Sequence, residues 1–431
     1  MRLRIAFIAA ALAASTLTGS GQPAVATHQV GAGFFDLAKV KAPDATGKQI
    51  YDGLKEFVAD YPYRYTSTPN EILAGQSLYS EMDGLGYETE MLTLAPNQQG
   101  QEICAGPAGC PGVGLKAITA TKRGTTKPNE YIMFIGHYDI AAGPLFANPI
   151  TLDGAYDNGS GTNLIRWLAH EFKDVPTNRS LMFVWYNGEE QGVLASDLHA
   201  AAMRQANVNV TAVLGFDMVG IAWPVGPTAT QPSGNYCLCM FHGAADGPRF
   251  KSLLEYVNFT HLGFPKANNK VTVVGNNTRN SDESSFAQQG FPTLRWAGMR
   301  TAANYPGYHR PEDTIATIES VAGGATYYEQ GVENTHKSAY YTALAIDNHT
   351  PVASFSHSVS GLTVSVDGSG SSDVDGPLSS FTWDFGDGST GEGATASHTY
   401  SAPGTYDVTL TVADNLWAGA TASVTFPVTV G

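Results

Sequence analysis

The feature that most constrains the fold is an alternation of apolar strand-like runs with amphipathic helical segments across residues 34–347. The expected strands are short apolar runs, whereas the expected helices repeat apolar residues every three or four positions. The predicted strands are 131–135, 181–186, 210–219 and 293–296, and the predicted helices are 160–173, 195–204, 250–257 and 315–345. Such alternation is typical of parallel strands joined by crossover helices. We therefore predict an α/β three-layer sandwich with a mostly parallel, mixed central sheet.

The composition changes abruptly near residue 350. Residues 351–431 contain no lysine or arginine, and Ser, Thr, Gly and Val dominate. The runs 362–366 and 406–412 alternate in hydropathy with the two-residue period of half-buried strands. We predict a small all-β, immunoglobulin-like sandwich over 348–431, preceded by a larger domain over 27–347.

Residues 1–26 have the features of a secretory signal peptide. Arg2 and Arg4 precede an apolar run over 5–17, and Ala24-Val25-Ala26 fits the small-x-small cleavage pattern. The apolar run is too short to span a bilayer. We therefore expect a secreted, extracellular protein with no membrane anchor after signal removal. Residues 27–45 would be either a removable propeptide or an N-terminal extension.

Charge and cysteine content agree with export. The formal net charge of -15 favours solubility and argues against nucleic-acid binding. Cys104, Cys110, Cys237 and Cys239 form an even set, which permits three disulfide pairings. Cys104 and Cys110 close a short loop, although the Cys237-x-Cys239 pair could instead cross-link to them. A structural zinc held by four thiolates is the less favoured alternative in an exported chain.

Ionisable side chains gather at the ends of the predicted strands and before the predicted helices. An ionised carboxylate costs free energy to desolvate, so such groups at buried strand ends need a function. In chain order the candidates are His137, Asp139, Asp157, Glu189, Glu190, Asp217 and His309. Histidines mixed with carboxylates suit zinc, and one shared carboxylate would allow a two-metal site.

Local structural roles compete with metal binding at these positions. Asp157 could cap the helix that follows it, because Asp, Asn and Ser are common N-caps. We expect Ser160 to cap that helix, which would leave Asp157 free to point into a site. Asp313 and Thr314 are expected to cap the last helix, a role that does not compete with His309 as a ligand. The pattern His-Glu-x-x-His and the pattern Gly-x-Ser-x-Gly are both missing from the sequence.

Taken together, the motifs resemble the secreted bimetallic zinc aminopeptidases of peptidase clan MH. Five motifs in the right order are far more specific than any one of them. The motifs are His137-x-Asp139, Asp157-Asn158-x-Ser160-Gly161, Glu189-Glu190, Asp217 and Tyr308-His309. The resemblance covers about three quarters of the chain.

The resemblance implies two zinc ions per chain. Asp157 would bridge them, His137 and Asp217 would complete one metal site, and Glu190 and His309 would complete the other. A metal-binding histidine needs its second ring nitrogen oriented.

The resemblance also implies the catalytic residues. Glu189 would be the general base and acid, and Tyr308 would donate a hydrogen bond to the tetrahedral oxyanion. Asp139 is the expected acceptor for the second ring nitrogen of His137. The implied activity is hydrolysis of N-terminal peptide bonds, on peptides or proteins with a free N-terminus. The alternatives are a carboxypeptidase or a glutaminyl cyclase on the same metal scaffold, and a non-catalytic adhesion protein.

Two positions depart from the pattern of that family. The segment Ser281 to Phe286 resembles a family motif that usually has His where Glu283 stands, which puts a substrate-facing role of this loop in doubt. Tyr156 stands where smaller or acidic residues are common.

The C-terminal region resembles a PKD-type (polycystic-kidney-disease-type) domain. Its motifs are Trp383 to Gly388, His398-Thr399-Tyr400 and Pro403 to Tyr406. We expect Trp383 and Tyr400 to pack in the core of the sandwich. The domain would be either a spacer or an adhesion module for insoluble protein or polysaccharide. We expect the protein to be a monomer. The acids that could hold calcium, or simply form a solvated face, are Asp373, Asp375, Asp384 and Asp387.

Overall fold

The structure is a computed structural model that describes residues 41–95, 114–141, 153–221, 239–242, 247–264, 281–298, 305–347, 351–373, 378–414 and 420–431. The predicted signal peptide lies outside these residues, as do Cys104, Cys110 and Cys237, so the disulfide predictions stay untested. Cys239 begins a strand. Among the helices in the described ranges, none combines the length and the apolar character needed to cross a membrane.

The larger domain is built on a seven-stranded sheet with the order β1-β2-β4-β3-β5-β7-β6. The strands are β1 Glu88–Ala95, β2 Leu115–Lys122, β3 Lys127–His137, β4 Arg179–Tyr186, β5 Asn209–Asp217, β6 Cys239–His242 and β7 Thr293–Ala297. Strands β4, β3, β5 and β7 run parallel, whereas β1, β2 and β6 are antiparallel to their neighbours. The predicted mostly parallel, mixed sheet is confirmed.

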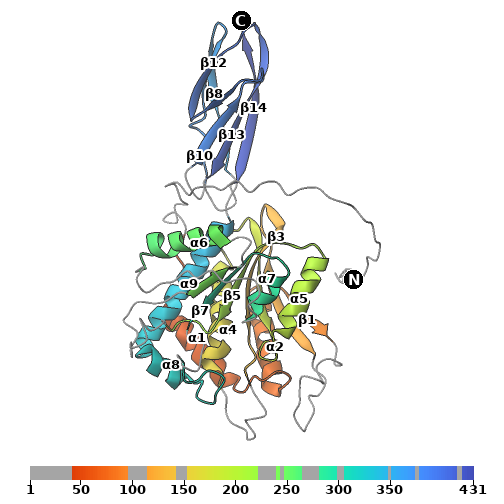
Figure 1. Ribbon diagram of the computed structural model, residues 1–431, viewed down its shortest axis with the longest axis vertical. Coiled ribbons are helices and arrows are strands. Elements are labelled where there is room, and N and C mark those ends of the chain that lie inside the picture. Colours follow the sequence, from red (N-terminus) through yellow and green to blue (C-terminus); the bar gives the residue numbers. More distant parts are fainter. Residues whose placement is uncertain are drawn as a thin grey trace. The chain divides into compact units, whose positions relative to one another are not determined.

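Helices cover both faces of this sheet, which makes the three layers predicted from the sequence (Figure 1). Side chains of β3 alternate between two cores: Ile132 and Phe134 join one, and Met133 and Ile135 join the other. The first core is covered by α1 Gly47–Asp60, α2 Pro69–Gly84, α4 Gly161–Phe172, α6 Gly247–Glu255, α8 Ile315–Ala322 and α9 Ala325–Asp347. The second is covered by α5 Leu194–Gln205 and α7 Asp282–Gln288. Two short segments complete the described elements of this domain: η3 Tyr256–His261 is a turn of π-helix, and η2 Ala155–Ser160 is a turn whose backbone departs from helical angles at Asp157 and Asn158.

The single long helix predicted over 315–345 is wrong, because two helices occupy this region. Helix α8 ends at Gly323, which has a φ of 88° and whose N–H bonds back to carbonyls of the last turn. Gly324 follows with a φ of 129°. Glycine adopts this left-handed region without the steric cost of a Cβ, so the pair ends one helix and redirects the chain into α9.

The parallel strands bring the predicted site residues to one edge of the sheet. Strand β3 ends at His137, its neighbour β4 ends at Tyr186 just before Glu189, and its other neighbour β5 ends at Asp217. Functional groups of open α/β sheets gather where parallel strands end, because all the carboxyl ends lie together there. The topology therefore explains why residues 80 positions apart can share one centre.

The C-terminal region is an all-β sandwich of two antiparallel sheets, ordered β11-β10-β13-β14 and β12-β9-β8. Trp383 and Tyr400 are buried in its core, as predicted. Trp383 donates its ring N–H to Gly393 O at 2.9 Å, and Tyr400 donates its hydroxyl to Phe385 O at 2.9 Å. The strands are β8 Ser356–Ser360, β9 Thr363–Asp367, β10 Leu378–Asp384, β11 Thr390–Glu392, β12 Thr395–Thr399, β13 Gly404–Asp414 and β14 Thr421–Val430.

Two of the acids considered for calcium stabilise turns of the sandwich. Asp384 accepts from the N–H of Gly386 at 2.8 Å, and Asp387 accepts from the N–H of Ser389 at 2.9 Å. Asp387 also contacts His398 Nε2 at 2.8 Å, and both contacts hold the pKa of its carboxyl below the ordinary value. Asp375 lies outside the described residues. In the part of the chain that the structure describes, the His and carboxylate groups spaced for a metal ion all lie in the larger domain.

Candidate metal centre

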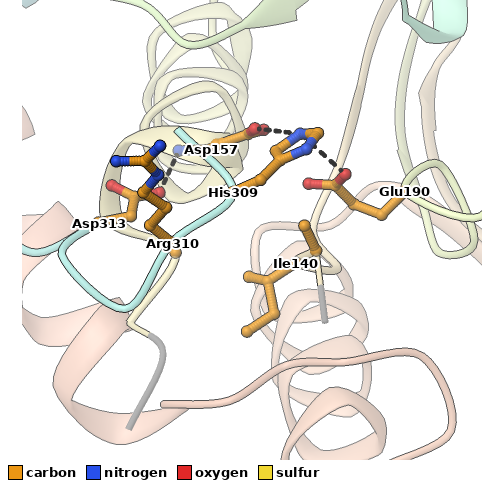
Figure 2. Close-up of a pocket in the computed structure, with 8 residues that line it drawn as sticks. Ile140, Asp157, Glu190, His309, Arg310 and Asp313 are labelled. Atoms are coloured by element: carbon orange, nitrogen blue, oxygen red, sulfur yellow. Dashed lines mark hydrogen bonds and ion pairs between the residues drawn. The ribbon is translucent and has the colours of Figure 1, made fainter. Parts of the chain in front are cut away.

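The five predicted ligands lie together, in two groups that share Asp157. His137 Nε2 is 3.5 Å from Asp157 Oδ1 and 3.8 Å from Asp217 Oδ1. His309 Nε2 is 3.2 Å from Asp157 Oδ2 and 3.3 Å from Glu190 Oε2. Figure 2 shows His309 between these two carboxylates. Within each group the ligand atoms lie within 4.8 Å of one another, as the donors of a single metal ion would.

Asn158 connects three elements around this centre, a role that its place in the motif did not predict. Its Nδ2 donates to His137 O at 3.2 Å and to Phe216 O at 2.9 Å, at the ends of β3 and β5. Its Oδ1 accepts from the N–H of Met218 at 3.2 Å and from the N–H of Gly161 at 3.0 Å. The Asp157–Asn158 peptide bond is cis. One side-chain amide therefore ties two ligand-bearing strands to the start of α4.

The prediction that Ser160 caps α4 is wrong. Ser160 itself has helical backbone angles, φ -62° and ψ -49°, and its side chain makes no capping bond. An N-cap residue needs an extended backbone to turn its side chain back onto the helix. The hydroxyl instead donates to Tyr156 O at 2.6 Å and accepts from the N–H of Val219 at 3.0 Å. At the start of α4 the side chain of Asn158, not that of Ser160, accepts a hydrogen bond from the N–H of Gly161.

Asp313 positions Asp157, whereas the sequence suggested only a helix cap. Its Oδ2 accepts from the N–H of Asp157 at 2.9 Å, and its Oδ1 accepts from the N–H of Tyr156 at 2.9 Å and from Tyr305 OH at 2.7 Å. Burial raises the pKa of Asp313 to about 7, and the donors from Tyr305 and from Asp157 oppose that rise. Thr314 caps α8 as predicted, by accepting from the N–H of Thr317.

The centre carries more negative than positive charge away from water. Burial raises the pKa of Glu190 well above its ordinary value, and Asp157 and Glu189 raise it further. Burial also raises the pKa of Glu189, against the opposing effect of His137. For His137 burial lowers the pKa, but the carboxylates of Glu189, Asp139 and Asp217 outweigh it and hold the pKa well above the ordinary value. Buried carboxylates that repel one another are stabilised by a cation.

The donor set fits zinc. Histidine nitrogens and carboxylate oxygens are its usual ligands, and a mixed set favours it over ions that bind oxygen alone. The buried Oε1 of Glu190 accepts no hydrogen bond from the residues that the structure describes. A bound cation would satisfy this oxygen as well as the mutual repulsion of the acids.

Asp139 lies beside His137, as predicted, but its carboxylate is not the nearest acceptor. His137 Nδ1 is 3.2 Å from the backbone oxygen of Asp139 and 3.5 Å from its Oδ1. The carboxylate also lies 3.0 Å from the hydroxyl of Thr66 and 3.4 Å from the N–H of Glu189. Asp139 therefore orients the histidine through its main chain and connects it to the loop that carries the two glutamates.

Tyr308 lies at the centre, with its ring stacked on the ring of His309 at a centroid distance of 3.8 Å. Burial raises the pKa of its hydroxyl above the ordinary value, and Asp157 and Asp217 add to the effect. The hydroxyl therefore keeps its proton at neutral pH and can donate a hydrogen bond.

The two departures from the family pattern have structural explanations. Glu283, on α7, is buried and lies 3.1 Å from the guanidinium of buried Arg295 on β7, so its charge is compensated inside the α7 layer. Glu283 is not among the residues that line the pocket beside His309. Tyr156 packs its ring against the ring of Tyr305 at 4.7 Å, and its N–H bonds to Asp313.

A pocket opens beside the second ligand group, as Figure 2 shows. Two of its lining side chains, Ile140 and Ala141, are apolar and five are ionisable. Its lining residues are Ile140, Ala141, Gly154, Asp157, Glu190, His309, Arg310 and Asp313.

Comparison with known proteins agrees with this geometry. The model of peptidase family M28 matches residues 117–327, and the model of the PKD domain matches residues 348–430. The chain carries a peptidase domain of family M28, a zinc aminopeptidase family, followed by a PKD domain. Both resemblances predicted from the motifs are confirmed at the level of the family.

Named relatives of this M28 protein share only part of its length. A probable zinc metalloprotease of Pyrenophora tritici-repentis is 34% identical over 112 residues, which are 25% of each chain. Aminopeptidase YwaD of Bacillus subtilis is 25% identical over 254 residues, which are 53% of this chain and 50% of the relative. The chain thus spans half or less of the length of these relatives.

Solved structures share the fold at low sequence identity. The LapA aminopeptidase of Legionella pneumophila matches with a TM-score of 0.55 and 16% identity, covering 77% of this chain and 80% of that one. A glutaminyl cyclase of an Acidobacteriales bacterium matches with a TM-score of 0.51 and 18% identity, covering 72% and 97%. The same fold therefore occurs in an aminopeptidase and in a glutaminyl cyclase, so the fold alone does not distinguish these two activities.

Proposed function

We propose that the protein is a zinc-dependent aminopeptidase that uses two metal ions to hydrolyse the N-terminal peptide bond of peptides or proteins. The observation that carries the proposal is the pair of ligand groups that share Asp157, each with one histidine and a second carboxylate. A two-metal site of this kind suits hydrolysis of an amide bond. Membership of the M28 family supports the same activity.

The two adjacent glutamates divide into a ligand and a base in this proposal. Glu190 lies in one group with Asp157 and His309, and its side chain is only 4% exposed. Glu189 shares no group with Asp157, and its carboxylate lies 3.8 Å from His137 Nε2. Glu189 also forms a group with His137 and Glu190, but the two groups that share Asp157 are complete without it, so we assign Glu189 to proton transfer.

When bound, zinc would polarise the scissile carbonyl and lower the pKa of the attacking water, so that this water gives up its proton more readily. Glu189 takes the proton of that water and gives it to the amine that leaves, so one carboxylate acts first as base and then as acid. Tyr308 keeps its hydroxyl proton and donates it in a hydrogen bond to the oxyanion that forms at the carbonyl.

Secretion remains part of the proposal and rests on the sequence alone. Residues 1–26 have a basic start, an apolar run and a small-x-small site. N-terminal sequencing of the protein recovered from the medium should find a mature chain that begins after Ala26 or, if a propeptide is removed, further along. Recovery of the intact chain inside the cell would contradict this part.

The activity is tested with matched substrates. Free aminoacyl and dipeptide substrates should be cleaved, the same substrates acetylated on the amino group should not, and a chelator should abolish cleavage. Equal cleavage of acetylated substrates would contradict an aminopeptidase and favour a carboxypeptidase. A chelator without effect would contradict the metal mechanism.

A peptide that begins with glutamine distinguishes an aminopeptidase from a glutaminyl cyclase. An aminopeptidase releases free glutamine and a peptide shortened by one residue. A glutaminyl cyclase instead closes the N-terminal glutamine onto its own side chain, releases ammonia and leaves every peptide bond intact. Mass spectrometry of the products distinguishes the two, because the cyclised peptide loses only the mass of ammonia.

A further inference from the structure

A short segment far from the ligands in sequence carries buried polar side chains that face the metal centre. Residues 61–71 comprise the link between α1 and α2 and the first turn of α2, and they lie outside the region 117–327 that matches the peptidase family. Within this segment Arg64 is 0% exposed, Thr66 is 6% exposed and Glu71 is 1% exposed. Burying such groups is costly unless they are hydrogen-bonded, so their partners indicate what the segment does.

Arg64 joins two of the ligand-bearing loops. Its Nε donates to Tyr138 O at 2.9 Å, one residue after His137. Its Nη1 donates to Asp153 O at 2.9 Å and its Nη2 donates to Gly154 O at 2.9 Å, on the approach to Asp157. The planar guanidinium holds these carbonyl groups in one fixed arrangement, which a lysine cannot do.

Arg64 stays charged in this position. Burial lowers the pKa of its guanidinium to about 10, while Asp313, Asp153 and Asp139 act to raise it. The side chain is therefore a cation at neutral pH, and its hydrogen bonds to carbonyl oxygens are of the strong, charge-assisted kind.

Thr66 connects the loop that carries Glu189 and Glu190 to the loop that carries Asp139. Its hydroxyl lies 3.0 Å from Asp139 Oδ2 and 2.7 Å from Gln191 Oε1, and it accepts from the N–H of Gly188 at 3.2 Å. Gly188 and Gln191 lie on either side of the two glutamates. A single hydroxyl therefore links the loop of Asp139 to the loop of Glu189 and Glu190.

Glu71 makes a second connection between the same two loops. Its carboxylate accepts from the hydroxyl of Tyr138 and from Asn187 Nδ2, the latter at 3.2 Å. The N–H of Ser67 also donates to it at 2.9 Å, which fixes the carboxylate to its own segment. Tyr138 follows His137, and Asn187 precedes the glutamates.

We infer that Arg64, Thr66 and Glu71 are positioning residues, which set the distances between the loops that carry His137, Asp157 and Glu190. The inference rests on the proposed function, because it assumes that these loops hold metal. It adds a requirement that the family region alone does not contain. Ligands must be held within about 0.5 Å of their binding geometry, so loosening one loop should weaken metal binding before it unfolds the protein.

The chain offers a matched control for the test. Thr68 lies in the same segment and is also a threonine, but it caps α2 by accepting from the N–H of Glu71 and donates to Tyr63 O at 3.0 Å. Among the described residues, its hydroxyl makes no hydrogen bond to the loops around the centre. Thr68→Val removes a bond to the main chain of Glu71 and leaves the donors to the Glu71 carboxylate in place, whereas Thr66→Val removes a hydroxyl that contacts two of the ligand loops.

The experiment measures zinc affinity by competition with a chelating dye, together with thermal unfolding of the zinc-free protein. Thr66→Val and Arg64→Lys should weaken zinc binding about 10- to 100-fold relative to wild type. Thr68→Val should leave zinc affinity within about twofold, even where its zinc-free unfolding temperature falls as far as that of Thr66→Val. Should Arg64→Lys fail to fold, the comparison of the two threonine variants decides the matter alone.

The outcomes separate this inference from the proposed function. Zinc affinities that are the same in Thr66→Val and Thr68→Val overturn the positioning role. A selective loss of zinc affinity in Thr66→Val supports that role even if the wild-type protein cleaves none of the peptides, a result that would overturn only the proposed activity. A wild-type chain that binds no zinc overturns both.

Discussion

The two folded regions bury different kinds of side chain. The sandwich fills its core with Trp383, Tyr400 and a set of valines, and its described acids are exposed or partly exposed apart from Asp414. The peptidase domain also has apolar cores, yet at one edge of its sheet it buries His137, Asp157 and Asp217 side by side. Apolar burial stabilises the sandwich directly, at about 25 cal/mol per Å².

This difference indicates that the stability of the peptidase domain depends on a bound cation, whereas that of the sandwich does not. Buried carboxylates repel one another and lose their hydration, so the edge of the peptidase sheet is unfavourable until a cation is bound. The sandwich has no comparable cluster among its described residues. The contrast predicts that metal removal and acid will change the peptidase domain alone. A truncation in the core of the sandwich should change the sandwich alone.

Metal removal should give the largest difference between the regions. A chelator should abolish peptidase activity and lower the unfolding temperature of the peptidase domain, because zinc present at a thousandfold excess over its Kd stabilises the folded state by about 4 kcal/mol. The unfolding transition of the sandwich should not move. Calorimetry with and without chelator measures both transitions, and an equal shift of the two would break the comparison.

Replacing the proposed base should remove activity without removing metal. Glu189→Gln should lower kcat on the order of 10²- to 10⁴-fold, because the glutamine cannot accept the proton of the attacking water. Zinc content measured by mass spectrometry should match wild type. Glu312→Gln, at an exposed position in the loop of His309, is the control and should keep full activity. A Glu189→Gln protein with normal zinc and full activity would contradict the assignment.

Truncating the core of the sandwich should have the opposite pattern. Trp383→Ala should lower the free energy of unfolding of the sandwich by about 3–5 kcal/mol, since it leaves a large cavity and the unpaired carbonyl of Gly393. Denaturant unfolding of the sandwich measures this loss. The kcat/KM on a dipeptide should stay at the wild-type value, and a parallel loss of activity would show that the two regions depend on each other.

Acid should act on the peptidase domain through buried histidines. Burial lowers the pKa of His336 to about 4, below its ordinary value of 6.5. Between these pH values the unfolded chain binds a proton that the folded chain does not, so stability present above pH 6.5 is lost as the pH falls towards 4. The loss for one such histidine is about 3 kcal/mol. His357 and His398 of the sandwich are not buried.

The test for this effect is the slope of unfolding free energy against pH in zinc-free protein, so that loss of metal does not contribute. His336→Gln should flatten the slope of the peptidase domain between pH 6.5 and 4, and the slope of the sandwich should not change. His357→Gln serves as the control at an exposed site. An unchanged slope in His336→Gln would show that acid acts through other groups.

The sequence predicts those parts of the molecule that depend on local patterns. Apolar runs gave β4 and β7 within two residues at each end, and ionisable residues just after such runs gave the ligands. Parallel strands bring their carboxyl ends to one edge, so the grouping of His137, Asp157 and Asp217 follows once the strands are recognised. The break between α8 and α9 could also have been predicted, since Gly323-Gly324 is visible in the sequence.

The supporting residues could not be predicted in the same way. Arg64 binds carbonyl groups 74 and 90 residues away, so no local window contains both partners. Asp313 has the local pattern of a helix cap, but its carboxylate turns to the main chain of Asp157, 156 residues distant. Main-chain atoms carry no sequence signal of their own, and only the folded arrangement shows which polar side chains they require.

The most direct test of the two-metal centre is the zinc content of the wild type beside two single variants. The arrangement predicts two zinc ions per chain in the wild type, one in Asp217→Asn and a loss of both in Asp157→Asn, since Asp157 is the residue that the His137–Asp217 group shares with the Glu190–His309 group. Isothermal titration into zinc-free protein gives the stoichiometry. One ion in the wild type, or two ions retained by Asp157→Asn, would contradict the shared-aspartate centre.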